Sequence, residues 1–215
     1  MKLVMGNKNY SSWSLRPWLA MRQMGLAFEE VVIPMNQPET RARMLEHSPT
    51  GLVPTLVDGD VTVWETLAIL EYLNDLHPAA GLWPAERAAR AHARAIAAEM
   101  HAGFAALRRD CPMNMRRPVR RHIPSPQGQA DAARVDALWS DARARFGADG
   151  PFLFGRFTAA DAMYAPVVNR FHVYDLPRSA PAEAYMDAIM ALPAWREWDD
   201  AARAEPWVID KSEVP

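Results

Sequence analysis

The sequence predicts an α/β N-terminal domain with the element order βαβαββα, followed by an all-α C-terminal domain. Two observations support this fold class. Residues 1–78 mix short β-type runs with helical patterns, whereas the chain from Glu86 onward is rich in Ala and Arg and has almost no β-type runs. Between the two parts, residues 79–85 have the Pro and Gly content of a linker, because both residue types end helices. We therefore predict domains of residues 1–78 and 86–215.

The overall composition is that of an ordinary globular protein. The 215 residues are 50% hydrophobic and 23% charged, which is enough chain to bury a sizeable core. A net charge of −2 implies no general attraction to nucleic acid or to a membrane surface. Cys111 is the single cysteine, so an intrachain disulfide, a CxxC redox pair and a cysteine-cluster metal site are excluded. No apolar run has the length of a membrane helix and no secretion signal is evident, so we expect a cytoplasmic protein without a bound metal.

The first two elements are a strand and a helix. Residues 2–5 form a short apolar run, which is typical of a strand. Leu15 and Trp18 share one face of a helix that ends at Gly25. Pro17 has no amide hydrogen and is tolerated only near a helix start, so this helix is predicted to begin among the serines between positions 11 and 14.

A second strand and a short helix follow. Residues 28–33 read as a strand that Pro34 ends, and residues 39–46 read as a helix with Met44 and Leu45 pointing inward. The β-α-β start implies a parallel strand pair with a right-handed crossover.

The N-terminal domain ends with a hairpin and a helix. Residues 55–57 and 61–64 are predicted strands around Asp58 and Gly59, a strong turn signal. This hairpin adds antiparallel strands to the sheet. Leucines spaced three apart over residues 67–76 then predict a helix.

The second domain is predicted to contain five helices, at 86–110, 129–147, 158–171, 181–191 and 194–204. The third of these has the clearest start, because Thr158 and Asp161 have the spacing of a capping box. We therefore interpret Asp161 as a helix cap and not as a catalytic acid.

Four motifs together resemble those of soluble glutathione transferases. Residues 10–16 resemble the Ser-Ser-Cys-Ser-x-Arg run of the zeta class, with Trp13 where that class has cysteine. The Val-Pro at 53–54 resembles the cis-proline step of the superfamily, and the Glu-Thr at 65–66 resembles its acid-hydroxyl pair. Residues 158–161 resemble the capping box of its buried C-terminal helix. The resemblance covers essentially the whole chain and implies a thioredoxin-like N-terminal domain, glutathione as co-substrate and a homodimer.

An enzyme of this kind must form a thiolate at neutral pH, although an ordinary thiol has a pKa of about 8.5. Unpaired amides and the positive dipole end at the start of the first helix favour an anion there, and a serine hydroxyl can donate to it. By resemblance, Ser11 matches the catalytic serine of the zeta class. Ser12 and Tyr10 remain alternatives, and the serines can also be plain helix caps.

The same resemblance assigns residues to glutathione binding. Val53, held extended by Pro54, can pair its backbone with the cysteinyl part of the tripeptide. Thr66 and nearby amides can hold the γ-glutamyl carboxylate at a helix start, and Glu65 can hold the ammonium group. Taken alone, these residues would equally fit a loop proline and a capped helix.

Two departures from the pattern matter. Many relatives have Lys or Gln directly before the Val-Pro step, where it reaches the glycyl end of glutathione, and this chain has Leu52. His47 is the nearest polar substitute by position. The replacement of cysteine by Trp13 weakens the case for the isomerase activity of the zeta class, but it does not affect thiolate stabilisation.

The electrophile pocket is expected between the domains, where ligand sites are common. Its predicted walls are Trp13, Phe104, Met113 and Asn114, which can equally be core residues. A nearby basic cluster can attract an anionic electrophile or simply face solvent; its members are Arg108, Arg109, Arg116, Arg117, Arg120 and Arg121.

The expected function is glutathione transfer to a small electrophile, and the alternatives differ in chemistry. One is a non-catalytic ligand-binding or protein-interaction module with the same fold. Another is a glutathione-dependent isomerase such as maleylacetoacetate isomerase. The expected partners are glutathione, the electrophile and a second copy of the chain, with no nucleic acid and no membrane.

Overall fold

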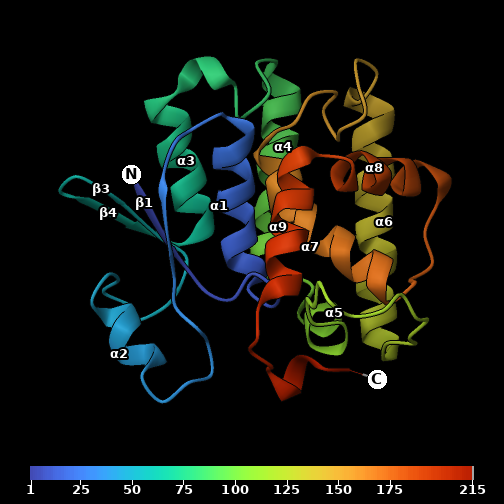
Figure 1. Ribbon diagram of the computed structural model, residues 1–215. Helices are drawn as coiled ribbons and strands as arrows, with labels where there is room; N and C mark the ends of the chain where they lie inside the picture. The colour runs from blue at the N-terminus through green and yellow to red at the C-terminus, as the bar shows by residue number, and fades with distance from the viewer. Residues whose placement is uncertain (215) are drawn as a thin grey trace.

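The N-terminal strands form one mixed four-stranded sheet in the computed structural model, which describes residues 1–214 (Figure 1). The strands are β1 (Lys2–Met5), β2 (Glu29–Val32), β3 (Thr55–Asp58) and β4 (Val61–Trp64). Their order is β2-β1-β3-β4. β1 is parallel to β2 and antiparallel to β3, which pairs antiparallel with β4. The predicted parallel start and antiparallel hairpin are confirmed.

Three helices complete this part of the chain: α1 (Ser12–Gln23), α2 (Thr40–Leu45) and α3 (Thr66–Leu76). α1 and α3 pack against each other and lie between the sheet and the helices of the second half, whereas α2 lies apart from them (Figure 1). The prediction that the first helix begins among the serines is confirmed.

The inward orientation predicted for Leu45 is wrong. Met44 is buried against Val4 and Ile33, whereas Leu45 is 49% exposed. α2 is only six residues long and lies at the outside of the sheet, so it has one inward position and not two.

The second half is helical, as predicted. Its helices are α4 (Arg87–Ala102), α5 (Ala105–Asp110), α6 (Pro126–Phe146), α7 (Ala159–Val173), α8 (Ala180–Met190) and α9 (Pro193–Ala204), and short 3-10 turns cover η1 (Pro78–Ala80) and η2 (Asp210–Ser212). None of the helices within residues 1–214 is long and apolar enough to cross a membrane.

The prediction of one continuous helix over residues 86–110 is wrong, because the chain breaks at Gly103 and Phe104. Phe104 has a φ of 58°, in the left-handed region that few residues other than glycine adopt. A new helix, α5, starts immediately after it. Its first amides, those of Ala106 and Leu107, donate to the Asp131 carboxylate of α6 at 3.1 and 3.0 Å. This cap comes from a distant helix, so the local sequence does not reveal it.

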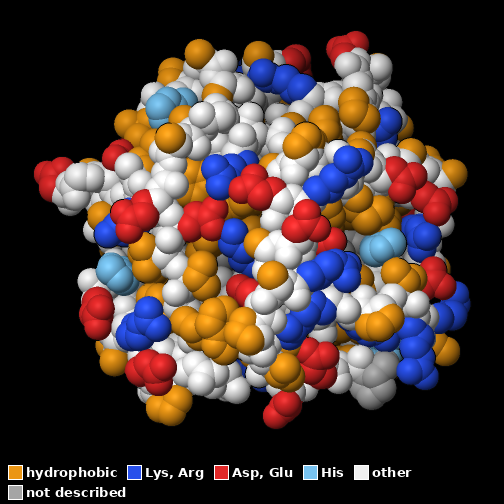
Figure 2. Space-filling view, in the orientation of Figure 1, with side chains coloured by type: hydrophobic (Ala, Val, Ile, Leu, Met, Phe, Trp, Pro, Cys, Tyr) orange, Lys and Arg blue, Asp and Glu red, His pale blue; other side chains and the backbone are white. Residues whose placement is uncertain are grey.

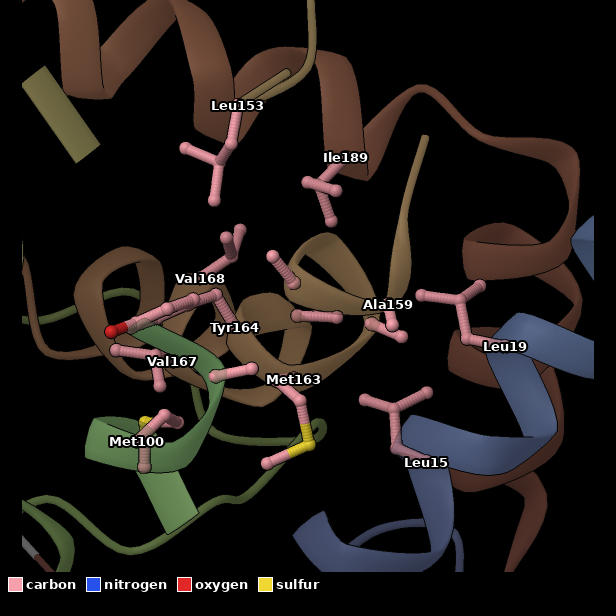
Figure 3. Packing of buried hydrophobic residues seen from close by; sticks show 14 of the residues in the cluster. Leu15, Leu19, Met100, Leu153, Ala159, Met163, Tyr164, Val167, Val168 and Ile189 are labelled. Carbon is pink, nitrogen blue, oxygen red and sulfur yellow. The ribbon is translucent and has the colours of Figure 1, made fainter. Parts of the chain in front are cut away.

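α7 lies at the centre of the molecule. Its start is capped by Asp161, whose carboxylate accepts hydrogen bonds from the Thr158 amide at 2.7 Å and hydroxyl at 2.8 Å. Figure 3 shows Leu15 and Leu19 of α1 pointing toward Met163 and Ala159 of α7. This packing joins both halves in one hydrophobic core and fixes the helix that carries the predicted site serines.

Candidate active site

The start of α1 is bonded directly to the start of α3. Pro17 lacks the amide hydrogen that would reach the carbonyl of Trp13 four residues earlier. The Thr66 hydroxyl donates to that carbonyl instead, at 3.1 Å. This one hydrogen bond therefore satisfies the carbonyl that Pro17 leaves unpaired in α1, and it holds the N-termini of α1 and α3 side by side.

A cleft of about 350 Å³ lies beside this junction. It is lined by Trp13, Thr50, Leu52, Val53, Pro54, Trp64, Glu65, Thr66 and His101. The structure thus brings together most residues predicted to bind glutathione, and the Val53–Pro54 peptide bond is cis. His47 does not line this cleft.

Glu65 and His101 form one side of the cleft. Glu65 has a φ of 75°, an uncommon backbone conformation for a residue with a side chain, and such conformations cluster at functional sites. Its carboxylate lies 3.7 Å from Nε2 of His101, whose ring packs against that of Trp13 with centroids 5.2 Å apart. Sequence reasoning missed His101, since it comes from α4 and belongs to no motif.

The serines at the start of α1 are buried and linked. Ser11 is the N-cap residue, and its Oγ lies 2.7 Å from Oγ of Ser14. The Ser14 oxygen also accepts the amide of Gly6 at 3.1 Å. Neither Ser11 nor Ser12 lines the cleft, although Ser12 lines a second pocket described below.

The loop before α1 is anchored by the far end of the chain. The amides of Lys8 and Asn9 donate to the Glu205 carboxylate at 2.7 and 3.0 Å. The Tyr10 hydroxyl donates to Glu213 and accepts a hydrogen bond from Arg116 at 2.9 Å. The proton of this third candidate for thiol activation is therefore already in use.

A second pocket, of about 370 Å³, opens on the other side of the α1 start. It is lined by Tyr10, Ser12, Ala105, Arg108, Arg109, Pro112, Met113 and Arg170. Of the four predicted electrophile-pocket residues, it contains only Met113. Trp13 lines the first cleft, whereas Phe104 and Asn114 are 7% and 1% exposed and line neither.

The predicted basic cluster is only partly a solvent-exposed surface. Figure 2 shows basic side chains gathered below the middle of one face. Arg116, however, donates to the backbone carbonyls of Glu205 and Trp207, and Arg117 is buried and donates to those of Pro118 and other residues.

The single cysteine of the chain, Cys111, is buried. Burial raises the pKa of the Cys111 thiol to about 12, so it stays protonated at neutral pH. Among residues 1–214, no group of three or more His, Cys, Asp or Glu side chains is arranged to hold a metal ion.

Two protein-family domains match the chain. The N-terminal domain of glutathione S-transferases matches residues 10–76, and the C-terminal domain of the same family matches residues 88–201. The chain belongs to the glutathione S-transferase family.

Individual relatives agree with this assignment. A probable maleylacetoacetate isomerase of Caenorhabditis elegans is 37% identical over 94 residues, which is 43% of this chain and 42% of that protein. The match thus spans less than half the length of that curated relative. A Burkholderia glutathione transferase homologue solved with bound glutathione has a TM-score of 0.71 at 24% identity, covering 95% of this chain and 98% of that one. A sphingomonad glutathione S-transferase complexed with glutathione has a TM-score of 0.66 at 25% identity, covering 95% and 100%.

Proposed function

We propose that this glutathione S-transferase family protein binds glutathione in the first cleft and activates its thiol at the start of α1. The observation that carries the proposal is the junction of the two helix starts. Val53, Glu65 and Thr66 surround one cleft, and the bond from Thr66 to Trp13 puts the anion-favouring end of α1 against it.

The direction of the Thr66 hydrogen bond supports one arrangement of contacts to the γ-glutamyl end. The Thr66 hydroxyl donates its hydrogen bond to the Trp13 carbonyl, so toward a ligand its oxygen can only accept. It therefore suits the ammonium group, together with the Glu65 carboxylate. The γ-glutamyl carboxylate is left to the unpaired first-turn amides of α3.

The serine pair gives a route for stabilising the thiolate. Ser14 accepts from the Gly6 amide, so its own hydroxyl proton can be donated to Ser11. The proton of Ser11 is then left for a thiolate bound at the helix start. Such chains polarise each member, which strengthens the last donor. Ser12, which faces the second pocket, is the alternative donor.

The activated sulfur then attacks a small electrophile held in the second pocket. A glutathione-dependent isomerisation is the second candidate function, because a curated relative is named a probable maleylacetoacetate isomerase. A homodimer and a cytoplasmic location are further expectations that rest on similarity to the family.

The test is the pKa of the bound thiol. Glutathione binding is measured by titration calorimetry, and thiolate formation by ultraviolet absorbance of the complex as a function of pH. We expect binding and a thiol pKa at least about one unit below the free value near 8.5. Binding with an unchanged pKa would indicate a non-catalytic binding module, and no binding would contradict the assigned cleft.

A further inference from the structure

Glu205, the residue that follows α9, holds the loop that leads into α1. Its two carboxylate oxygens accept hydrogen bonds from consecutive backbone amides, those of Lys8 at 2.7 Å and Asn9 at 3.0 Å. The bonded residues are 197 and 196 positions apart in the sequence. A carboxylate suits this contact, because an ionised carboxylate only accepts and offers two oxygens to two neighbouring donors.

The turn that contains these amides ends at Ser11. The carbonyl of Asn7 closes the turn, because it accepts hydrogen bonds from the amides of Tyr10 at 3.2 Å and Ser11 at 2.8 Å. Lys8 and Asn9 lie inside the turn, so a shift of their amides also moves the backbone that carries the Ser11 hydroxyl. Glu205 is therefore connected to the proposed thiolate donor through the backbone of one short turn.

No other group in the described chain takes over this contact. Lys8 and Asn9 are 9% and 0% exposed, and within residues 1–214 their amides have no acceptor besides Glu205. The neighbouring anchors use the acceptors of the turn and not its donors. Trp198 donates to the Lys8 carbonyl at 2.9 Å, and the Met115 amide reaches the Asn9 carbonyl at 3.2 Å. Loss of one Glu205 oxygen thus leaves a buried amide unpaired while the rest of the loop stays attached.

Glu205 cannot assist a thiolate through its charge, because two negative charges disfavour each other. Burial raises the pKa of Glu205, whereas the two loop amides and the charges of Lys8 and Arg116 favour its ionised form. Arg116 also donates to the backbone carbonyl of Glu205. The negative charge is thus offset by cations beside it, and what Glu205 can contribute to thiolate formation is the position of the turn.

We propose that Glu205 is a positioning residue for the thiolate site, which fixes the turn of residues 7–11 so that Ser11 can donate to the sulfur of bound glutathione. This role rests on the proposed function, because the thiolate is that of glutathione in the first cleft. Val53, Glu65 and Thr66, which line that cleft, belong to other segments of the chain. Glu205 therefore controls ionisation of the bound thiol and not the affinity for the tripeptide.

Glu205→Gln separates the two ways in which this side chain could act. The variant keeps nearly the same size, but its amide nitrogen faces a backbone amide instead of accepting from it, so one end of the turn is released. Loss of a positioning acceptor weakens the hydrogen bond from Ser11 and raises the pKa of the bound thiol. Loss of a nearby negative charge lowers it. Ultraviolet absorbance of the glutathione complex as a function of pH gives the sign.

We expect the pKa of the bound thiol to rise by about 0.5–1 unit in Glu205→Gln, a fraction of what one hydrogen bond to a charged group contributes. Calorimetry at a pH where the thiol is protonated should give a dissociation constant for glutathione within about two-fold of the wild type. Asp199→Asn removes another carboxylate of α9, one that pairs with Arg203 at 2.9 Å, and is the matched control. It should change neither value.

A second comparison tests the route through Ser11. If Glu205 acts through this serine, Glu205→Gln should shift the thiol pKa much less when Ser11→Ala is already present, because coupled effects do not add. An equal shift in both backgrounds overturns the proposal.

A lowered or unchanged thiol pKa in Glu205→Gln, with glutathione bound normally, overturns it as well. If this variant does not fold, Glu205→Asp takes its place, since it keeps the carboxylate but draws it back by one methylene group. A raised thiol pKa in that variant supports the proposal, and an unchanged one overturns it. Wild-type protein that does not bind glutathione, or binds it without lowering the thiol pKa, contradicts the proposed function itself. Equal ionisation in the wild type and in Glu205→Gln removes only the role of Glu205.

Discussion

The hydroxyl of Thr66 donates a hydrogen bond to the backbone carbonyl of Trp13 at 3.1 Å, although the two residues are 53 positions apart in the sequence. That carbonyl has no partner within α1, because Pro17 lacks an amide hydrogen. Thr66 is 1% exposed, so its hydroxyl has little access to water.

Thr66→Val should therefore lower the free energy of unfolding by about 1–2 kcal/mol, the cost of leaving a partly buried carbonyl unpaired. It should also weaken glutathione binding, because the starts of α1 and α3 lose their link. Urea denaturation and titration calorimetry measure the two effects. Thr66→Ser keeps the hydroxyl and is the control, which should retain glutathione affinity within a few-fold. A stable Thr66→Val protein with normal affinity would contradict this role.

The Ser14-to-Ser11 relay makes a second prediction. Ser11→Ala should raise the pKa of bound glutathione toward the free value and cut turnover more than binding. Ser14→Ala should have a smaller effect in the same direction, because it removes only the polarising donor. The thiolate titration measures both. If Ser12→Ala alone moves the thiol pKa, the donor is Ser12 and the relay is not used.

Tyr10 provides a contrasting case. Its proton is donated to Glu213, so it has none for a thiolate. Tyr10→Phe should leave the thiol pKa unchanged. The loss of its bonds to Glu213 and Arg116 should cost about 0.5–2 kcal/mol of stability in urea denaturation. A raised thiol pKa in this variant would show that the tyrosine changes partner when glutathione binds.

Asp161 predicts a pH effect on stability. Its burial raises its pKa from 3.8 to about 6, although the carboxylate accepts hydrogen bonds from the Leu153 amide and from the amide and hydroxyl of Thr158. Between these pH values the folded chain holds a proton that the unfolded chain releases, so this group makes folding more favourable as the pH falls from about 6.5 to 4. Its contribution is on the order of 2–3 kcal/mol and is lost as the pH rises through 6.

Asp161→Asn removes this titration. We expect the variant to be less stable overall, because an amide cannot accept all three bonds of the carboxylate, and to lack the rise in stability toward pH 4 that the wild type shows. Urea denaturation at several pH values gives the difference between the two proteins. The same pH dependence in both would mean that Asp161 is not the titrating group.

The sequence predicts the sheet, its hairpin and most helices, since those signals are local: alternating apolar residues, an Asp58-Gly59 turn, and the capping box at Thr158. The break after Ala102 was missed because good helix formers lie on both sides of it. What stops the helix is Gly103 and the left-handed Phe104, with a new cap supplied by Asp131 from α6.

The residues of the candidate site likewise fall into those with a local sequence signal and those brought together by packing. Val53, Glu65 and Thr66 were found because each belongs to a short motif, and the structure places them around one cleft. His101 was not assigned to it by the sequence, because its role arises from the packing of α4 against Trp13. Phe104 and Asn114 were placed at a pocket by proximity in sequence, yet their side chains are buried.

The loop of residues 7–10 is anchored by residues near the other end of the chain, which affects the order of folding during synthesis. Its anchors are Glu205, Glu213 and the indole of Trp198, which donates to the Lys8 carbonyl at 2.9 Å. A chain emerging from the ribosome has residues 1–78 outside long before these partners are synthesised. The sheet can form during that interval, but the loop that positions the serines lacks its supports. This loop should therefore reach its final position only after residues 198–213 have been synthesised and have packed against it.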